Sequence, residues 1–171
     1  PTGGINTSYV ESAARFIAPM LDNYTVIVNK STVPIGTAEQ VSKVISEGNE
    51  NAIFDVASNP EFLREGSAID DFMKPDRIIV GVDNERPKKV LEQIYQPLVN
   101  EDVPLVMMDT KSAELTKYGA NAFLATKVAF INEMAALCDS TGANVKSVAK
   151  GIGLDKRIGP RFLNPGPGVG G

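Results

Sequence analysis

The sequence of 171 residues contains no histidine and only one cysteine, Cys138. Without histidine, the chain cannot itself supply a Ser-His or Cys-His catalytic pair, or a zinc site with histidine ligands. A single cysteine excludes an internal disulfide and favours a reducing compartment, so we expect a cytoplasmic protein. Because Cys138 continues an apolar helical pattern, it is expected to be a small buried residue rather than a nucleophile.

Long apolar runs and basic tracts are also missing. No run reaches the roughly 20 residues that a membrane-spanning helix needs, and no signal peptide precedes the first helical segment. The net charge is −4, the pI is about 4.9, and the lysines and arginines are not clustered. We therefore expect neither a membrane protein nor a nucleic-acid-binding surface, although a local basic pocket for a phosphate is compatible with this charge.

The residues that are present alternate between two patterns. Short β-branched or apolar runs, typical of buried strands, occur at 25–28, 53–56, 77–81 and 104–108. Amphipathic segments lie before and between these runs, and their expected helix starts are Ser8 with Glu11, Thr37 with Gln40, and Asn84. This alternation predicts an α/β fold, the second half of a Rossmann-like doubly wound parallel sheet with helices on both faces.

The pattern changes near residue 109, so we expect an α/β part over 1–109 and an all-helical part over 110–171. One long helix is expected from Lys111 to about Ser140, with Gly142 at its C-cap and Asn144 capping a second helix. One face of the long helix carries Lys117, Asn121, Leu124, Val128, Ile131, Ala135 and Cys138. The apolar part of this stripe is expected to face a core or a partner. Unpaired charges are costly on buried faces, so Lys117 and Asn121 should either reach solvent or enter a cleft.

Two loops follow predicted strands, at 30–37 and at 59–66. In open α/β sheets, ligands bind at the carboxyl ends of strands, where hydroxyls and free helix N–H groups collect. Glu61 and Glu65 are four apart and would share a face of a helical turn, where they could supply a general base and a ligand contact. The simpler alternatives are a plain turn capped by Thr37, and acidic residues that offset the dipole of a first helical turn.

The two ends of the chain suggest an interior piece of a longer protein. A nucleotide-binding α/β domain usually begins with a strand, a glycine-rich turn and a helix, and none of these is found before the first helical segment. The glycines at 166–171 superficially resemble a dinucleotide-binding pattern, but no strand precedes them, so we reject that interpretation.

Four stretches together resemble the nucleotide-sugar 6-dehydrogenases of the UDP-glucose/GDP-mannose dehydrogenase family. They are KSTVPIGT (30–37), NPEFLREGSAIDDFMKPDRIIVG (59–81), ELTKYGANAFLATKVAFINEMAALCDSTGANV (114–145) and GIGLDKRIGPRFLNPGPGVGG (151–171). The resemblance spans essentially the whole chain. It implies an enzyme of polysaccharide biosynthesis that uses NAD to oxidise UDP-glucose to UDP-glucuronate, through two hydride transfers and a cysteine thioester. The nucleophilic cysteine would follow shortly after Gly171, so the chain alone is expected to be inactive.

The resemblance also implies roles for individual residues. Thr32 would help to position water and the cofactor, and Glu65 would lie beside the cofactor. Glu61 would act in the general-base chemistry of thioester hydrolysis. Lys117 would stabilise negative charge on the substrate oxygen, and Asn121 would help to hold water or that oxygen. The remaining substrate contacts would be Phe62, Leu63, Arg64, Arg157, which is offered to the neighbouring subunit, and a closing loop with Phe162, Leu163, Asn164 and Gly170.

Several alternatives stay open at this point. A GDP-mannose dehydrogenase would share the PEFLREG segment (60–66), but ALCDSTGANV (136–145) and RIGPRFLNPG (157–166) look more like the UDP-glucose branch. A UDP-N-acetylmannosamine dehydrogenase fits less well, because its equivalent of the first segment reads differently. An alternative of another class is a non-catalytic assembly module, since the resemblance also implies a homodimer through the helix at 111–140.

Overall fold

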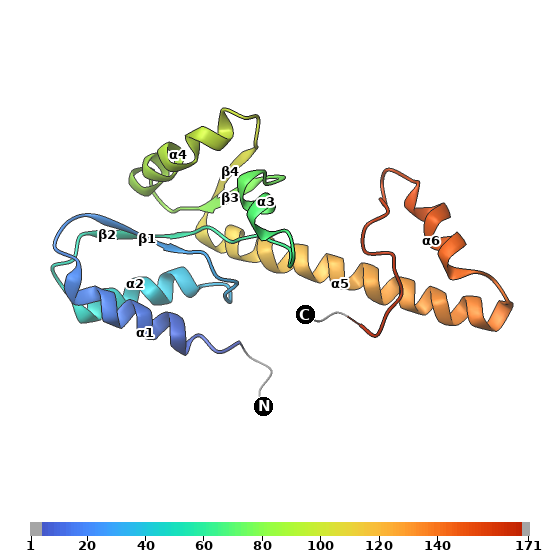
Figure 1. The fold of residues 1–171 in the computed structure, drawn as a ribbon. Coiled ribbons are helices and arrows are strands. Elements are labelled where there is room, and N and C mark those ends of the chain that lie inside the picture. Colours follow the sequence, from blue (N-terminus) through green and yellow to red (C-terminus); the bar gives the residue numbers. More distant parts are fainter. Residues whose placement is uncertain (1–4, 169–171) are drawn as a thin grey trace. The chain divides into compact units, whose positions relative to one another are not determined.

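The computed structural model describes residues 5–168, and the chain divides into two compact units, Pro1–Tyr118 and Gly119–Gly171 (Figure 1). The division falls inside the long helix α5 (Thr110–Thr141). Each unit is described by itself. In the described part of the chain, no helix combines the length and apolarity needed to cross a membrane.

The first unit is built on a four-stranded sheet in the order β1-β2-β3-β4. Strands β1 (Thr25–Asn29) and β2 (Phe54–Ser58) are parallel, as are β3 (Ile78–Gly81) and β4 (Leu105–Met108). Strands β2 and β3 meet antiparallel through one residue pair. The sheet is therefore mostly parallel, as predicted, and the exception follows from the segment between β2 and β3. That segment contains only the short helix α3 (Ala68–Met73), which has no fully buried residue and so does not serve as a crossover helix packed on the sheet.

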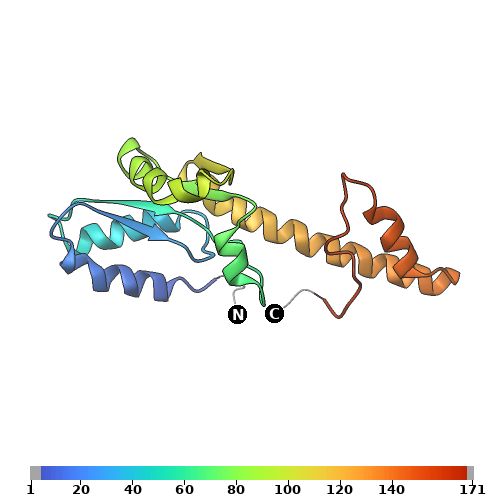
Figure 2. The same cartoon turned by 45° about the horizontal axis from the view of Figure 1, so that its top comes forward.

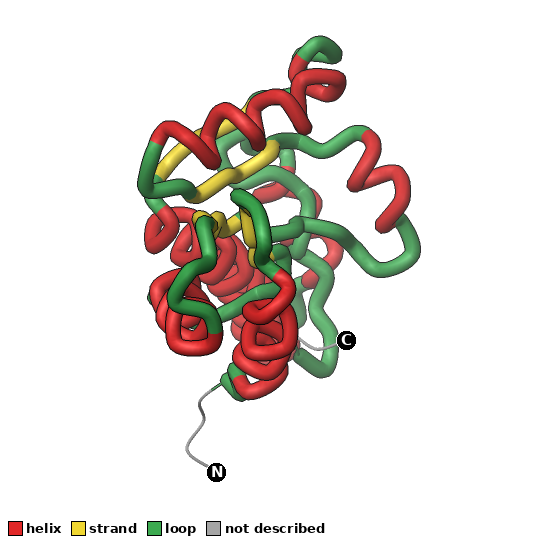
Figure 3. Tube along the Cα trace, turned by 90° about the vertical axis from the view of Figure 1, so that its left-hand side faces the viewer, coloured by secondary structure: helices red, strands yellow, loops and turns green. Residues whose placement is uncertain are grey.

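Helices cover both faces of this sheet, which confirms the doubly wound arrangement (Figures 1 and 3). On one face lie α1 (Ser8–Ile17), the 3₁₀ turn η1 (Ala18–Met20) and α2 (Thr37–Gly48), and on the other lies α4 (Glu85–Val99). Strand β1 shows the alternation directly. Ile27 packs against the α1–α2 core, whereas Val26 and Val28 pack against the core that α4 covers, because successive side chains of a strand point to opposite faces.

The predicted helix starts are confirmed where asparagine is the cap. The side-chain oxygen of Asn84 accepts from the Arg86 N–H at 3.0 Å and opens α4. In the second unit, Asn144 accepts from the Ser147 N–H at 3.0 Å and opens α6 (Val145–Gly153).

The two predicted capping boxes are wrong. Helix α1 already includes Ser8, and the residue at its cap position is Thr7, whose hydroxyl donates to the Glu11 carboxylate at 3.0 Å instead of capping a backbone N–H. Helix α2 already includes Thr37, whose hydroxyl donates to the Pro34 carbonyl at 2.6 Å. In α2 the bond of the Thr37 hydroxyl to this local acceptor competes with the cap. At the start of α1, the Ser8 N–H donates to the Asn6 side-chain oxygen at 2.9 Å.

The second unit consists of the rest of α5, helix α6 and the loop that follows it. Gly142 has φ +76°, the left-handed conformation expected of a residue just after a helix end. After α6 the chain returns to α5 (Figure 2). It is bound to α5 at two points, because Lys127 Nζ donates to the Ile158 carbonyl and the Gly166 N–H donates to Asn132 Oδ1, both at 2.9 Å. On the predicted apolar stripe of α5, Ile131 and Cys138 are buried. The stripe therefore faces the core of its own unit, which was one of the two alternatives.

Candidate active site

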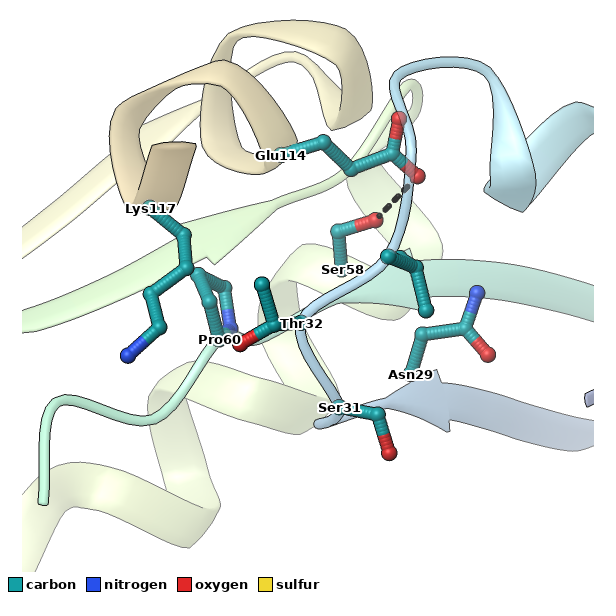
Figure 4. A pocket seen from close by; sticks show the side chains of 8 residues that line it. Asn29, Ser31, Thr32, Ser58, Pro60, Glu114 and Lys117 are labelled. Atoms are coloured by element: carbon teal, nitrogen blue, oxygen red, sulfur yellow. Dashed lines mark hydrogen bonds between the residues drawn. The ribbon is translucent and has the colours of Figure 1, made fainter. Parts of the chain in front are cut away.

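The carboxyl ends of β1 and β2 lie side by side and open a small pocket in the first unit (Figure 4). The Asn59 N–H donates to the Asn29 carbonyl at 2.8 Å and continues the ladder one step beyond β2. The pocket has room for about one water molecule. It is lined by Asn29, Ser31, Thr32, Val33, Ser58, Pro60, Glu114 and Lys117. It thus lies where strand ends in an α/β sheet place a ligand, and it brings the predicted residues Thr32 and Lys117 together.

Glu114 of α5 lies at one side of this pocket, and its carboxylate is almost fully buried, with 3% of the residue exposed. Its two oxygens accept from the Gly36 N–H at 2.6 Å and from the Ala38 N–H at 2.9 Å. The Ser58 hydroxyl is a third donor, at 3.2 Å (Figure 4). A carboxylate from a distant helix therefore caps α2, which explains why Thr37 is not needed as a cap.

This arrangement corrects one prediction about the loop at 30–37. We expected free helix N–H groups there that could hold a ligand, but the N–H groups of Gly36 and Ala38 are both bonded to Glu114. Gly36 has φ +91°, a conformation that glycine adopts without strain. The N-terminus of α2 is therefore closed by an internal anion, and the loop offers the hydroxyls of Ser31 and Thr32 to the pocket instead.

Lys117 forms an ion pair with Glu61 at the same pocket. Lys117 Nζ lies 3.3 Å from Glu61 Oε1, with the lysine side chain 8% exposed and the glutamate side chain 34% exposed. The other carboxylate oxygen of Glu61 accepts from the Leu63 N–H at 2.6 Å. We predicted that Lys117 would either reach solvent or enter a cleft, and it enters a cleft.

Two cations lie close to the Phe62 ring. The Arg77 guanidinium carbon is 3.8 Å from the ring centroid, and Lys117 Nζ is 5.0 Å from it. Cations are attracted to the face of an aromatic ring, and the attraction strengthens where water is excluded. Phe62 therefore holds the loop after Glu61 against Lys117, and Arg77 adds a second positive charge at the same ring.

The next residues of this loop are not among those that line the small pocket. Leu63, Arg64 and Glu65 are exposed, and Arg64 forms an ion pair with Asp71 while its N–H donates to Asp71 Oδ2 at 2.8 Å. The hydrogen bonds from the Arg64 guanidinium hold the pKa of the Asp71 carboxyl well below its usual range.

The helical turn predicted for Glu61 and Glu65 is therefore wrong. Residues 61–64 are irregular, and α3 begins only at Ala68. The reason is that Glu61 and Asp71 both accept backbone N–H groups of this segment, and such local bonds compete with the helical ones.

Asn59 anchors the start of the same loop and is 2% exposed. Its amide nitrogen donates to the Ile79 carbonyl at 2.8 Å, which joins β2 to β3 where the ladder has a single pair. Its side-chain oxygen accepts from Lys30 Nζ at 2.8 Å and from the Tyr95 hydroxyl. Burial lowers the pKa of Lys30 and raises the pKa of Tyr95, because each charged form would lose water.

The other predicted site residues belong to the second unit. Asn121 is exposed on α5, and Arg157 is exposed and paired with Asp155 at 2.6 Å. In the predicted closing loop, Phe162 has φ +64° and is exposed, as is Asn164, whereas the Leu163 side chain is buried near Gly153. Gly170 lies outside the described residues.

Sequence reasoning missed Glu114, Ser58 and Asn59. Glu114 occupies an ordinary helical position, and its partners stand far away along the chain, so no spacing in the sequence could reveal the contact. Ser58 and Asn59 carry a weak signal, because they are polar residues directly at the end of a predicted strand.

Comparison with known proteins places the whole chain in one group. Residues 1–99 match the model of the UDP-glucose/GDP-mannose dehydrogenase family, NAD binding domain, and residues 111–171 match the central domain of the same family. A UDP-glucose 6-dehydrogenase from Rhizobium meliloti (strain 1021) is 54% identical over 171 residues, which are 99% of this chain and 39% of that protein.

Solved structures give the same result. A UDP-glucose dehydrogenase from the hyperthermophilic archaeon Pyrobaculum islandicum matches 100% of this chain and 40% of its own, with 43% identity and a TM-score of 0.95. A GDP-mannose dehydrogenase from Pseudomonas aeruginosa matches 96% of this chain and 39% of its own, with 29% identity and a TM-score of 0.84. The chain thus spans about two fifths of the length of these relatives.

Proposed function

The chain belongs to the UDP-glucose/GDP-mannose dehydrogenase family, and from this premise we propose that it forms part of an NAD-dependent enzyme that oxidises UDP-glucose to UDP-glucuronate. The observation that carries the proposal is the Lys117–Glu61 ion pair beside a pocket at the carboxyl ends of β1 and β2. UDP-glucose is favoured over GDP-mannose because the relatives named for UDP-glucose are 54% and 43% identical, against 29% for the one named for GDP-mannose.

In the proposed reaction, Lys117 acts on the oxygen of the carbon that is oxidised. Its ammonium is held in a nearly dry position by Glu61 and by the Phe62 ring. A fixed positive charge in such a place stabilises negative charge on an oxygen far better than it would in water. Lys117 would therefore lower the barrier of each step in which that oxygen becomes anionic.

Glu61 is proposed to act in the hydrolysis of the thioester. Water adds to the thioester carbonyl while Glu61 takes one of its protons. The C–S bond then breaks, the cysteine leaves as a thiolate that takes the proton back from Glu61, and the carboxylic acid product loses its own proton to solvent and departs as a carboxylate. The carboxylate is already oriented, because one oxygen faces Lys117 and the other accepts the Leu63 N–H. The Thr32 hydroxyl lines the adjacent pocket and is proposed to hold the water.

The residues of this chain fit one end of the proposed cofactor. When bound, NAD accepts the hydride from the substrate carbon, and Thr32 and Glu65 are the residues proposed to hold it. The hydroxyls of Ser31 and Thr32 suit the carboxamide of a nicotinamide ring at a strand end. The diphosphate cannot use the N-terminus of α2, because Glu114 occupies the N–H groups of Gly36 and Ala38.

The proposed thioester does not form on Cys138. A nucleophilic thiol must be accessible, whereas Cys138 is 3% exposed in the second unit. The mechanism therefore takes its cysteine from another part of the enzyme. The use of a single cysteine fits a reducing compartment, and we propose a cytoplasmic enzyme.

We propose three further groups of substrate contacts. The first lines the sugar-nucleotide and consists of Phe62, Leu63, Arg64 and Asn121. Arg157 would contact the substrate of a neighbouring subunit, and a closing loop would supply Phe162, Leu163, Asn164 and Gly170. Because the Leu163 side chain is buried, its contribution would come from the backbone.

We also propose a homodimer through the helix at 111–140. On α5, Phe123, Phe130 and Leu137 are each at least half exposed and recur every seven residues, so they form one unpartnered apolar stripe. This stripe differs from the buried one predicted from the sequence. In a full-length enzyme, Phe130→Asp should convert dimers to monomers in multi-angle light scattering, and an unchanged mass would exclude this face as the interface.

The central experiment is a turnover assay of a full-length enzyme containing these residues, with NAD⁺ and UDP-glucose, in which NADH formation is followed by absorbance. We expect two NADH per UDP-glucose consumed, and weak or no turnover of GDP-mannose in competition. Turnover of GDP-mannose alone would support the alternative substrate. No turnover of any nucleotide-sugar would support the non-catalytic assembly module.

A further inference from the structure

Glu114 is a buried carboxylate that is held by hydrogen bonds and not by an ion pair among the described residues. In the described residues it takes part in no ion pair, and its three donors are two backbone N–H groups and one hydroxyl. Burying a carboxylate is costly unless each oxygen is well hydrogen-bonded, and the N-terminal end of a helix is a favourable place for a negative charge. The N–H groups of Gly36 and Ala38 at the start of α2 therefore stabilise the Glu114 carboxylate, and the carboxylate in turn provides their acceptor.

Glu114 is connected to each segment that carries a proposed site residue of the first unit. Its hydrogen bonds reach two of these segments, and the third is its own helix α5. Gly36 ends the loop that contains Thr32, and this loop is stiff because Val33 is buried and Pro34 has a fixed φ. Ser58 ends strand β2, shortly before Glu61. Glu114 itself stands three residues before Lys117 on α5, so both side chains lie on the same face of that helix.

We infer that Glu114 is a positioning residue for the proposed reaction: its carboxylate fixes the Thr32 loop, the end of β2 and the Lys117 side chain in one arrangement around the pocket. It touches no reacting atom. Catalysis is sensitive to such placement, since a shift of about 1 Å in a reacting group can cost roughly 10²-fold in rate. The inference rests on the proposed function and deepens it, because it names a residue that sets the rate of the chemical step.

The test is Glu114→Gln in a full-length enzyme. Glutamine has the same shape, but its NH₂ group cannot accept, so one of the backbone N–H groups of Gly36 or Ala38 loses its partner. We expect kcat of the folded enzyme to fall about 10- to 100-fold, while KM for UDP-glucose changes by less than about threefold. The fraction of folded enzyme is measured by size-exclusion chromatography and circular dichroism, so that rate and folding are separated.

Glu39→Gln is the matched control. Glu39 also connects α2 to α5, through an ion pair with Lys111 at 2.7 Å, but both side chains are more than half exposed and neither lines the pocket. This variant should keep the kcat of the unsubstituted enzyme. A kcat of Glu114→Gln equal to that of the unsubstituted enzyme, or an equal loss in both variants, would overturn the inference and leave Glu114 as a structural anchor.

Formate offers a second measurement. Glu114→Ala leaves the two N–H groups and the Ser58 hydroxyl facing a space the size of a small carboxylate, so added formate should raise kcat, whereas chloride at equal ionic strength should not. Equal effects of the two salts would count against the inference. If Glu114→Ala does not fold, Glu114→Gln decides alone. Absence of turnover in the unsubstituted enzyme would instead overturn the proposed function.

Discussion

Lys117 Nζ lies 3.3 Å from Glu61 Oε1, and this ion pair joins helix α5 to the loop that follows strand β2. The lysine is the more buried partner, so it depends more on the pair than the glutamate does. Removal of either group leaves the other charge in a partly dry place without its counterion, which is more costly than loss of a surface pair. In the proposed mechanism the two groups also act on different steps, so their variants should fail in different ways.

Lys117→Met should reduce kcat of a full-length enzyme by about 10²- to 10³-fold, because a fixed donor to the substrate oxygen is lost. Methionine keeps an unbranched apolar stem at this position but removes the ammonium that lies 5.0 Å from the Phe62 ring centroid. Steady-state NADH formation measures the effect. The control is Lys111→Met, because Lys111 is an exposed lysine on the same helix and should tolerate the change. An unchanged kcat for Lys117→Met would show that Lys117 serves only in packing.

Glu61→Gln should slow hydrolysis of the thioester by about 10²- to 10⁴-fold, since the proposed base is lost while the Leu63 N–H keeps an acceptor. Enzyme mixed with NAD⁺ and UDP-glucose should then accumulate a covalent adduct, visible as added mass in intact mass spectrometry. Glu50→Gln, at an exposed position beyond α2, is the control and should show no adduct. A slow Glu61→Gln variant without an adduct would place Glu61 in another step.

Cys138→Ala should leave kcat unchanged and lower the free energy of unfolding by about 1 kcal/mol, because it removes one buried sulfur atom from a packed site. The proposed mechanism uses a cysteine other than Cys138, and this chain has no other. The 171-residue chain alone should therefore form no NADH from NAD⁺ and UDP-glucose. Loss of turnover in Cys138→Ala without loss of folded protein, or turnover by the chain alone, would contradict the proposed mechanism.

The fold was largely predictable because its signals are local. The β-branched runs of the strands and the Asn84 and Asn144 caps depend on residues close together in the sequence, and the structure confirms them. The capping box at Thr37 failed because its hydroxyl bonds to the Pro34 carbonyl and a carboxylate from α5 satisfies the N–H groups of Gly36 and Ala38. The one at Ser8 failed because α1 already includes Ser8, and the Thr7 hydroxyl before it bonds to Glu11.

The candidate site was only partly predictable, for a related reason. The loops after β1 and β2 are marked as binding loops by their place at strand ends, and Lys117 by a charge on a largely buried helix face. The contacts that assemble them, Lys117 with Glu61 and Glu114 with Gly36, join residues from distant segments. Spacing along one element carries no information about such pairs, so Glu114 could be found only in the structure.

The Arg64–Asp71 pair predicts a pH effect in the loop between Glu61 and α3. Hydrogen bonds from Arg64 lower the pKa of Asp71 in the folded state. The pair therefore stabilises the fold above the pKa of an unfolded aspartate, near 3.9, and this contribution is lost as the pH falls through the lower folded value. In a carboxyl-carbon NMR titration, Arg64→Gln should move the Asp71 midpoint upward. The Asp155 midpoint, which Arg157 lowers, should stay the same, and an unmoved Asp71 midpoint would contradict the assignment.

Gly81 determines how closely α5 approaches the sheet. A Cβ atom at this position would lie 2.6 Å from Ala113 Cβ and 2.8 Å from Thr110 Cα, so Gly81→Ala must push the first turn of α5 away from β3. We expect a loss of about 1–3 kcal/mol in the free energy of unfolding, as for other overpacked sites. Gly119→Ala is the matched control, because a Cβ there meets no atom within 4 Å and alanine favours a helix by about 1 kcal/mol, so this variant should be more stable.

The first turn of α5 leads directly to Glu114 and Lys117, so Gly81→Ala should also lower kcat, whereas Gly119→Ala should not. Thermal unfolding and steady-state kinetics of the two variants, made in a full-length enzyme, measure both effects, and equal shifts in the two would show that the contact at Gly81 does not position the site.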